Sequence, residues 1–377
     1  MMEAYKRFEL LMNQQIVRTP IALASMAGIV DAAYVLERAG HIGAAFLGGF
    51  SIDEGTILAS HDLAEAGRAE FFFPDPVGGI RSEVEKLKGS DVVCGINLRG
   101  KTPAAFVHLA DELGDCAIYE IDAHCRQQPM IEAGAGEYLL SHHHDLCEIV
   151  RGLKSMDVCV SVKIRAGLTD ERALAKALWK AGADILHIDL MDYGYQKIRQ
   201  IRNACPLQII ANNSMHSYDR VMEQFSHGAD FVSLARRADL HTLKGLDAAI
   251  RRYADETGWY NAPKQLCRGG DLRALTFCCM PVKECPLIPA LKGINLGRNE
   301  YVNLKKGATT GTPLFDGSHT CFGSLAWCCK TSTPCMFRDM TLQNSGISKY
   351  EYMKQKRRLS EKIMEEIFNE VPADATC

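Results

Sequence analysis

The cysteines are the most reactive side chains of this 377-residue sequence, and they are unevenly distributed. Eight of the 15 cysteines lie between Cys267 and Cys335. Cys278 and Cys279 are followed after five residues by Cys285, and the same CC-x5-C pattern returns 50 residues later. Each unit has one further cysteine upstream, so the segment contains two matched groups of four. We predict that these eight thiolates bind metal, with inert buried cysteines as the alternative. The predicted ligands are Cys267, Cys278, Cys279, Cys285, Cys321, Cys328, Cys329 and Cys335.

The spacing also bears on the kind of metal centre. Four thiolates suit tetrahedral zinc and also a 4Fe–4S cluster. Zinc sites usually carry paired C-x2–4-C knuckles, which this segment lacks. Adjacent cysteines cannot easily bind one small ion without backbone strain. The pattern therefore favours one or two iron–sulfur clusters, with zinc as the alternative.

A second set of polar residues lies in the first 240 residues, each directly after a short apolar run. Lys163 and Arg165 alternate within one such run, so both point to the same face of a strand. Two cations are costly to bury without an opposite charge. A bound anion such as phosphate would supply that charge, and salt bridges to Asp122 and Asp189 are the alternative. Other residues at such positions are Ser25, Met26, Asn97, His124, Cys125, Asn212, Ala235 and Arg236.

The elements that must position these residues are strands and helices in alternation. We predict strands at residues 21–24, 44–47, 92–97, 117–122, 158–164, 184–189, 207–211 and 230–234. We predict helices at residues 32–38, 103–113, 136–154, 171–181, 195–203, 218–225 and 246–253. Continuous apolar runs that alternate with helices indicate parallel strands buried on both faces. Because no strand carries a Gly-rich dinucleotide fingerprint, the eight units predict an α/β fold of the (β/α)8 TIM-barrel type. Residues 50–87 form a long insertion, in which three phenylalanines at 71–73 would form a lid or a packing loop.

Composition and charge set the wider organisation. Lys and Arg number 43 against 46 Asp and Glu, which excludes a protein whose main task is to coat nucleic acid. The sequence has no apolar run of about 18 residues, and its charged start lacks a signal-peptide core, so we expect a cytoplasmic protein without a membrane span. We divide the chain into a barrel (1–258), a C-terminal Cys-rich metal-binding domain (259–340) and a terminal amphipathic helix with its tail (341–377).

Segments at several of these strand ends resemble the flavin-dependent tRNA-dihydrouridine synthases. Residues 119–127 (YEIDAHCRQ) and 134–140 (GAGEYLL) resemble the active-site segment of that family, in which a cysteine precedes a Gly-Ala-Gly helix start. Residues 160–167 (VSVKIRAG) match its fifth strand. Residues 24–31 (ASMAGIVD) resemble its first flavin loop, and residues 209–213 (IIANN) resemble its phosphate loop.

The resemblance implies that FMN binds at the mouth of the barrel. Cys125 would donate a proton to a substrate carbon, because a thiol stays largely protonated at neutral pH, while reduced flavin supplies hydride. Lys163 would contact the flavin ring, and Asn97 the flavin or the substrate. The implied cofactor-binding residues are Ser25, Met26, Asn97, Lys163, Arg165, Asn212, Ala235 and Arg236.

The chain also departs from the family. AHCR (123–126) stands in place of Asn-x-Gly-Cys-Pro, and DLM (189–191) in place of His-Gly-Arg. The Gly-containing motifs after strands seven and eight are NN (212–213) and AR (235–236). The Cys-rich segment replaces the helical RNA-binding domain. That segment, with CMFRD at 335–339, resembles the methanogenesis marker protein 9 family, which implies an archaeal protein from a methanogen.

Three functions follow as hypotheses. The first is a flavin-dependent, iron–sulfur-linked oxidoreductase that transfers hydride to an unsaturated substrate, with Cys125 as proton donor. The second is a tRNA-dihydrouridine synthase. The third is a non-catalytic iron–sulfur carrier or assembly factor linked to methanogenesis. The expected partners are a small-molecule or RNA substrate and an electron-donor protein.

Overall fold

The computed structural model describes residues 10–13, 15–202 and 207–257, together with residues 307, 310, 311 and 346. Residues 17–202 and 207–250 form one compact unit. The eight predicted cysteine ligands between Cys267 and Cys335 lie outside the described residues, as do almost all of the predicted Cys-rich domain and C-terminal helix.

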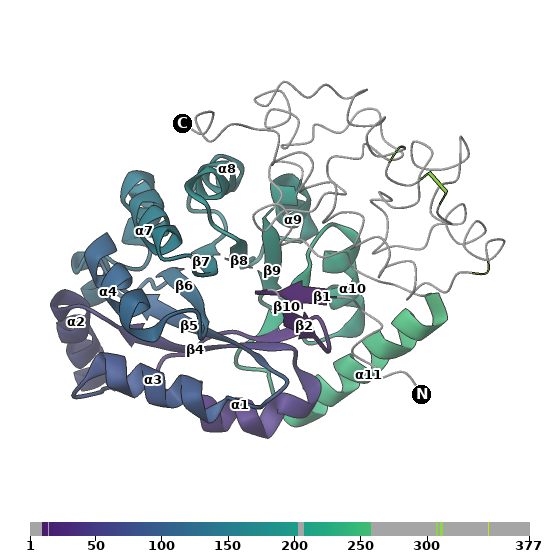
Figure 1. The fold of residues 1–377 in the computed structure, drawn as a ribbon, viewed down its shortest axis with the longest axis horizontal. Helices are drawn as coiled ribbons and strands as arrows, with labels where there is room; N and C mark the ends of the chain where they lie inside the picture. Colours follow the sequence, from purple (N-terminus) through teal and green to yellow (C-terminus); the bar gives the residue numbers. More distant parts are fainter. Residues whose placement is uncertain are drawn as a thin grey trace. The chain divides into compact units, whose positions relative to one another are not determined.

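Eight parallel strands close into a barrel, which confirms the predicted TIM-barrel fold (Figure 1). Their order around the barrel follows the sequence, and the last strand pairs with the first through Val232 and Ile21. Almost every strand residue is buried, as expected for strands covered on both faces. The strands are β3 (Ile21–Leu23), β4 (Ala44–Ser51), β5 (Val93–Arg99), β6 (Ile118–Ala123), β7 (Val160–Arg165), β8 (Ile185–Asp189), β9 (Gln208–Asn212) and β10 (Phe231–Leu234). A separate two-stranded sheet, β1 (Leu10–Met12) with β2 (Gln15–Val17), precedes them in the chain and was not predicted.

Helices connect the strands and lie outside the barrel (Figure 1). They are α1 (Ala32–Arg38) with the short 3-10 helix η2 (Ala39–His41), α2 (Glu54–Glu65), α3 (Pro76–Lys86), α4 (Pro103–Leu113), α5 (Gln128–Glu132), α6 (Tyr138–Ser141), α7 (His143–Ser155), α8 (Glu171–Ala181), α9 (Tyr195–Arg202), α10 (Tyr218–Ser226) and α11 (Leu240–Thr257). Several begin at an aspartate whose carboxylate accepts backbone N–H groups of the first turn, at Asp31, Asp53 and Asp170. Gly182 ends α8 in the left-handed conformation, at φ 104°, which is a common helix C-terminus.

Two predicted segments differ from the observed elements. The insertion at 50–87 contains α2 and α3, whose start signals are the capping box of Asp53 with Thr56 and the proline at Pro76. The single helix predicted at 136–154 is divided into α6 and α7, because His142 leaves the helical conformation between them.

Gly136, at φ 63°, cannot be replaced by a larger residue, since an added Cβ would lie 2.2 Å from the carbonyl oxygen of Cys125.

The three phenylalanines of the insertion pack against the barrel unit. The ring centroids of Phe71 and Phe73 lie 5.2 and 5.8 Å from that of Phe50, and Phe72 stacks on His61 at 4.5 Å. Contacts of this kind are favourable aromatic pairs. These contacts agree with the packing-loop alternative.

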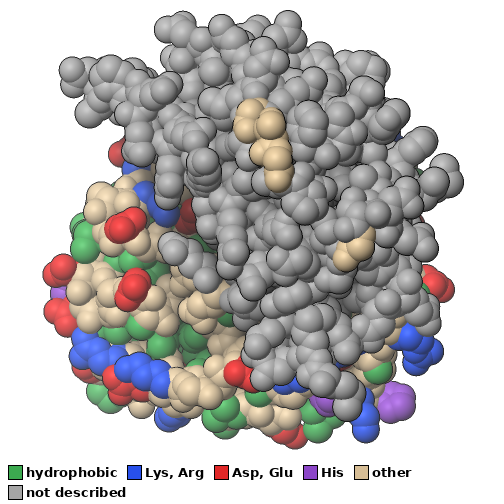
Figure 2. All heavy atoms as spheres, turned by 45° about the vertical axis from the view of Figure 1, so that its right-hand side comes forward, with side chains coloured by type: hydrophobic (Ala, Val, Ile, Leu, Met, Phe, Trp, Pro, Cys, Tyr) green, Lys and Arg blue, Asp and Glu red, His purple; other side chains and the backbone are tan. Residues whose placement is uncertain are grey.

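The described surface carries charges of both signs. Figure 2 shows basic and acidic side chains side by side along the lower left of the molecule. Exposed ion pairs such as Arg81 with Glu112 and Lys88 with Glu85 belong to the helix surfaces. These pairs contribute little to stability and keep the helix faces solvated. Among the described residues, no helix combines the length and the apolar character needed to cross a bilayer.

Candidate active site

A cavity of about 750 Å³ opens at the C-terminal ends of the barrel strands. Its volume is typical of a site for a cofactor or small ligand. All eight strands, or the loops that follow them, contribute to its wall, as expected for a TIM-barrel active site. The structure brings every predicted barrel-site residue to this cavity: Ser25, Met26, Asn97, Cys125, Lys163, Arg165, Asn212, Ala235 and Arg236.

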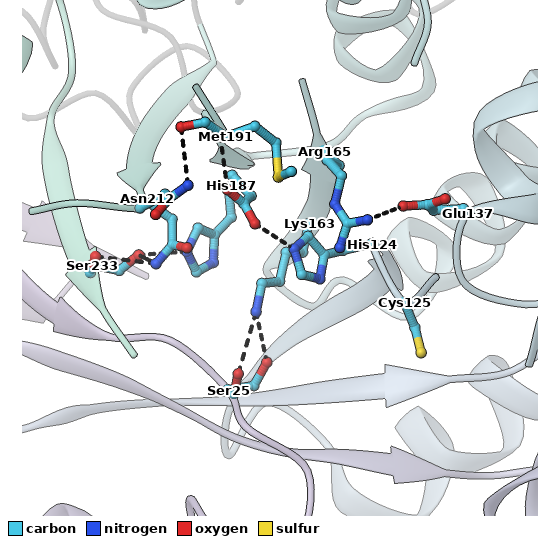
Figure 3. Close-up of polar contacts among 12 residues, drawn as sticks. Ser25, His124, Cys125, Glu137, Lys163, Arg165, His187, Met191, Asn212 and Ser233 are labelled. Carbon is cyan, nitrogen blue, oxygen red and sulfur yellow. Dashed lines mark hydrogen bonds and ion pairs between the residues drawn. The ribbon is translucent and has the colours of Figure 1, made fainter. Parts of the chain in front are cut away.

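Lys163 is the central cation of the cavity. It lies on β7, its residue is only 4 % exposed, and its Nζ contacts the hydroxyl and carbonyl oxygens of Ser25 at 3.0 and 3.4 Å (Figure 3). Within the described residues, the ammonium group has no carboxylate within ion-pair distance. A buried cation of this kind favours a bound anion.

Salt bridges from Lys163 and Arg165 to Asp122 and Asp189, the alternative to a bound anion, are not formed. Arg165 instead pairs with Glu137 of the loop before α6 (Figure 3). Asp122 pairs with Arg99 of β5 at 3.3 Å, and Asp189 contacts His124 at 2.8 Å. Two of these partners, Glu137 and His124, come from loops whose approach the local sequence does not specify.

Below the cavity, the fully buried carboxylate of Glu120 holds three side chains together. Asn97 Nδ2 and Ser161 Oγ each donate to it at 2.9 Å, and His187 Nδ1 lies 2.8 Å away. Burial would raise the pKa of Glu120, but its contact with His187 and the nearby Lys163 ammonium lower it. Glu120 is therefore an ionised acceptor inside the barrel.

The same network fixes the tautomer of His187. Asn212 Nδ2 donates to Ser233 Oγ at 2.8 Å, and the same hydroxyl oxygen lies 2.7 Å from His187 Nε2. Burial lowers the pKa of His187. Because the Glu120 carboxylate can only accept, His187 Nδ1 carries a proton and donates it to Glu120.

Cys125 follows β6 and is 8 % exposed at the edge of the cavity. Burial, and then the Asp122 carboxylate, raise the pKa of the thiol, while Arg99 opposes them. The thiol form is therefore favoured at neutral pH. Asp122 Oδ1 accepts the Cys125 backbone N–H at 3.0 Å and so holds this turn. Cys125 belongs to an apolar cluster with Ala59, Leu63, Met130 and Ala135.

The neighbouring His124 points in a different direction from Cys125 (Figure 3). Its Nε2 lies 2.8 Å from Asp189 Oδ2, and Asp189 Oδ1 accepts the Met191 backbone N–H at 3.0 Å. Burial would raise the pKa of Asp189, but the hydrogen bonds from His124 and Met191 lower it to about 2. Asp189 is therefore a carboxylate throughout the physiological pH range.

The loops after β9 and β10 form the basic side of the cavity. Arg236 and Arg237 line it and have no ion-pair partner in the part of the chain that the structure describes. Asn213 and Ser214 follow β9 with φ values of 84° and 61°. Loops in these two positions commonly bind phosphate in TIM barrels. This side of the cavity therefore suits an anionic group.

Several cavity residues were missed by the sequence reasoning. Arg99 lies two residues after Asn97 on β5, so the two-residue period of a strand would have placed both on one face. His124 was noted beside Cys125 without a role. Arg68 and Glu70 belong to the insertion, and no local signal shows that Glu70 pairs with Arg99 at 2.6 Å.

The described residues contain no group of three His, Cys, Asp or Glu side chains arranged to hold a metal ion. The zinc and iron–sulfur predictions concern cysteines outside that part of the chain. They stay predictions.

Comparison with known proteins identifies the class of barrel. The family model described as "Dihydrouridine synthase (Dus)" matches residues 94–241, from β5 to the start of α11. The resemblance of this part of the barrel to the synthases is therefore confirmed.

Two relatives come from Methanocaldococcus jannaschii. Uncharacterized protein MJ0115 is 48% identical over 107 residues, which are 28% of this chain and 69% of that protein. The chain belongs to the same family as MJ0115. Uncharacterized protein MJ0144 is 27% identical over 227 residues, 57% of this chain and 88% of that protein. The resemblance to the methanogenesis marker protein 9 family stays a prediction.

Among solved structures, TcOYE with pHBA aligns with a TM-score of 0.46 and 10% identity, over 65% of this chain and 93% of that chain. A structure of 2,3-dimethylmalate lyase aligns with a TM-score of 0.40 and 14% identity, over 63% of this chain and 81% of that chain.

Proposed function

We propose that the barrel binds FMN and reduces a carbon–carbon double bond of its substrate. The observation that carries this proposal is the buried Lys163 ammonium, which faces a cavity of about 750 Å³ without a carboxylate partner among the described residues. The dihydrouridine synthase match over residues 94–241 supports it independently.

The residues of the cavity fit FMN. The Oδ1 atom of Asn97 is buried without a hydrogen-bond partner, so it can accept an N–H group of a flavin ring. Lys163 would balance the charge of an anionic ring, and Arg236 with Arg237 would bind the phosphate. When bound in its reduced form, FMN supplies a hydride.

The protein's own part in the reduction is to deliver a proton. The Cys125 thiol would transfer its proton to the substrate carbon next to the one that receives hydride. The resulting thiolate faces Arg99, whose positive charge stabilises it. Solvent protons would then restore the thiol for the next cycle.

The test of this function is anaerobic purification of the full chain, followed by flavin, iron and sulfide analysis. We expect stoichiometric FMN. We further propose, from the cysteine spacing alone, that the same protein holds one or two iron–sulfur clusters that pass electrons to the flavin. Replacement of Cys328 by serine should then remove iron and leave flavin bound. A colourless protein that contains only zinc would contradict both proposals.

Lys163→Met should weaken FMN binding by about 10- to 100-fold, because a buried charged contact contributes roughly 1.5–3 kcal/mol. The loss should be similar for riboflavin, since Lys163 is proposed to contact the flavin ring and not the phosphate. Fluorescence quenching of either flavin measures both constants. Lys176→Met, on the outer helix α8, provides the control.

The double replacement of Arg236 and Arg237 by glutamine should act differently. It removes the charges proposed to bind phosphate, so FMN binding should weaken at least about tenfold. Riboflavin, which lacks the phosphate, should bind as tightly as it does to the unaltered protein. An equal loss of affinity for FMN and riboflavin would show that Arg236 and Arg237 do not bind the phosphate.

A second candidate function is synthesis of dihydrouridine in tRNA, which the family match over residues 94–241 favours. It uses the same chemistry on a different substrate. Deletion of the gene, followed by measurement of dihydrouridine in total tRNA, decides the matter. An unchanged dihydrouridine content rules this substrate out and leaves the flavin-dependent reduction standing.

A further inference from the structure

His124 and Asp189 form a held pair of side chains in the wall of the cavity. The distance from Nε2 to Oδ2 is 2.8 Å, and the His124 side chain is 23 % exposed. Further hydrogen bonds hold both partners in place. Asp122 Oδ1 accepts the His124 backbone N–H at 2.9 Å, and Asp189 Oδ1 accepts the Met191 backbone N–H. A pair held at both ends is preorganised for binding or catalysis.

The other ring nitrogen of His124 is available to a ligand. The described residues give Nδ1 no hydrogen-bond partner, and the ring lines the cavity together with Asp189. Nε2 donates to the ionised Asp189, and when the ring is an imidazolium Nδ1 is a second donor. The pair therefore presents one N–H donor to a molecule in the cavity.

Charges on the neighbouring strands act on the same ring. The negative charge of Asp122 on β6 and the positive charges of Lys163 and Arg165 on β7 line the cavity together with His124. His187 of β8 is fully buried and bound to Glu120. Arg165 is bound to Glu137, so the closest partner of the His124 ring is Asp189.

We propose that the His124–Asp189 pair binds the oxygen atom of a conjugated substrate and stabilises the negative charge that develops there during reduction. This inference rests on the proposed function. A double bond conjugated to a carbonyl or amide oxygen accepts hydride at its far carbon, and the electron pair of that bond moves onto the oxygen. The His124 N–H stabilises this oxyanion, the Cys125 thiol then protonates the near carbon, and the carbonyl bond forms again. The substrate class is therefore a conjugated carbonyl compound rather than an isolated alkene.

The directions of the two side chains explain why His124 and Cys125 have different proposed roles. His124 and Cys125 are adjacent in sequence but point in different directions, so they can serve different atoms of one substrate (Figure 3). Oxyanion donors of this kind typically contribute about 10²- to 10³-fold to kcat.

The test uses 4-nitrophenol, a flat conjugated ring that carries its charge on oxygen when ionised. Difference absorbance of the full-length protein, as purified, gives the affinity for the phenolate and for the neutral phenol. We expect the phenolate to bind about 10- to 100-fold more tightly, as is typical of a charged hydrogen bond. His124→Gln should abolish this preference, and Asp189→Asn should reduce it. His108→Gln, an exposed position on α4, is the matched control and should keep the preference.

Two results would contradict the role proposed for the His124–Asp189 pair. One is an unaltered protein that binds phenol and phenolate equally or binds neither, and the other is a His124→Gln protein that keeps the full preference. The probe needs no turnover, so protein without flavin, which would contradict the proposed function, still gives a result for His124. Retained flavin with no phenolate preference would leave the proposed function in place and remove only this inference.

Discussion

Replacement of Cys125 by alanine is expected to slow reduction of the substrate about 10²- to 10⁴-fold while FMN remains bound. The reason is the loss of the only thiol that both lines the described cavity and is kept protonated by its surroundings. The measurement is the rate at which cyclohexenone reoxidises photoreduced flavin under anaerobic conditions. Binding of FMN, followed by its fluorescence, should change little.

Matched variants make this result specific. Cys125→Ser keeps the volume but offers a far weaker acid, so it should not restore the rate. Cys147→Ala removes a cysteine that is similarly buried on α7, outside the cavity, and should leave the rate unchanged. If Cys125→Ala retains full activity whereas His124→Gln does not, the proton comes from the imidazole and the role given to the thiol is wrong.

Replacement of Glu120 by alanine is expected to lower the free energy of unfolding by about 3–5 kcal/mol, the usual result of removing one partner from a buried charged group. The variant leaves the donors of Asn97, Ser161 and His187 without their acceptor inside the barrel. Urea denaturation of the full chain measures the change. Glu132→Ala, at an exposed position on α5, should cost well under 1 kcal/mol.

The pH dependence of the same experiment gives a second readout. The folded pKa of Glu120 is lowered, so its contribution is fully present above the ordinary carboxyl range and is lost as pH falls through the folded value. The difference in stability between the unaltered protein and Glu120→Ala should therefore shrink in acid. A difference that stays constant down to low pH, or a variant as stable as the unaltered protein, would show that the network does not depend on an ionised Glu120.

The strands and their ends were predictable from sequence because the signals are local. Continuous apolar runs mark strands buried on both faces, and the C-terminal ends of parallel strands in a closed barrel meet at one mouth. This rule is sufficient to bring Ser25, Asn97, Lys163 and Asn212 together without any knowledge of their contacts.

The pairing of charges at the mouth could not be predicted in this way. The partner of Arg165 is Glu137, which depends on how the α5–α6 loop folds back, and the partner of Asp189 is a histidine from another strand. The direction of the Cys125 side chain is likewise set by packing against Ala59 and Leu63 of α2. These are tertiary effects, which propensity and spacing do not encode.

The insertion after β4 is connected to the turn at Cys125 through two buried ion pairs. Glu70 contacts Arg99, Arg99 contacts Asp122, and Asp122 accepts the backbone N–H of Cys125. A change of sequence in this insertion can therefore alter the surroundings of the Cys125 thiol without changing any strand of the barrel. Exchange of the whole insertion between homologues would carry this effect on Cys125 from one protein to the other.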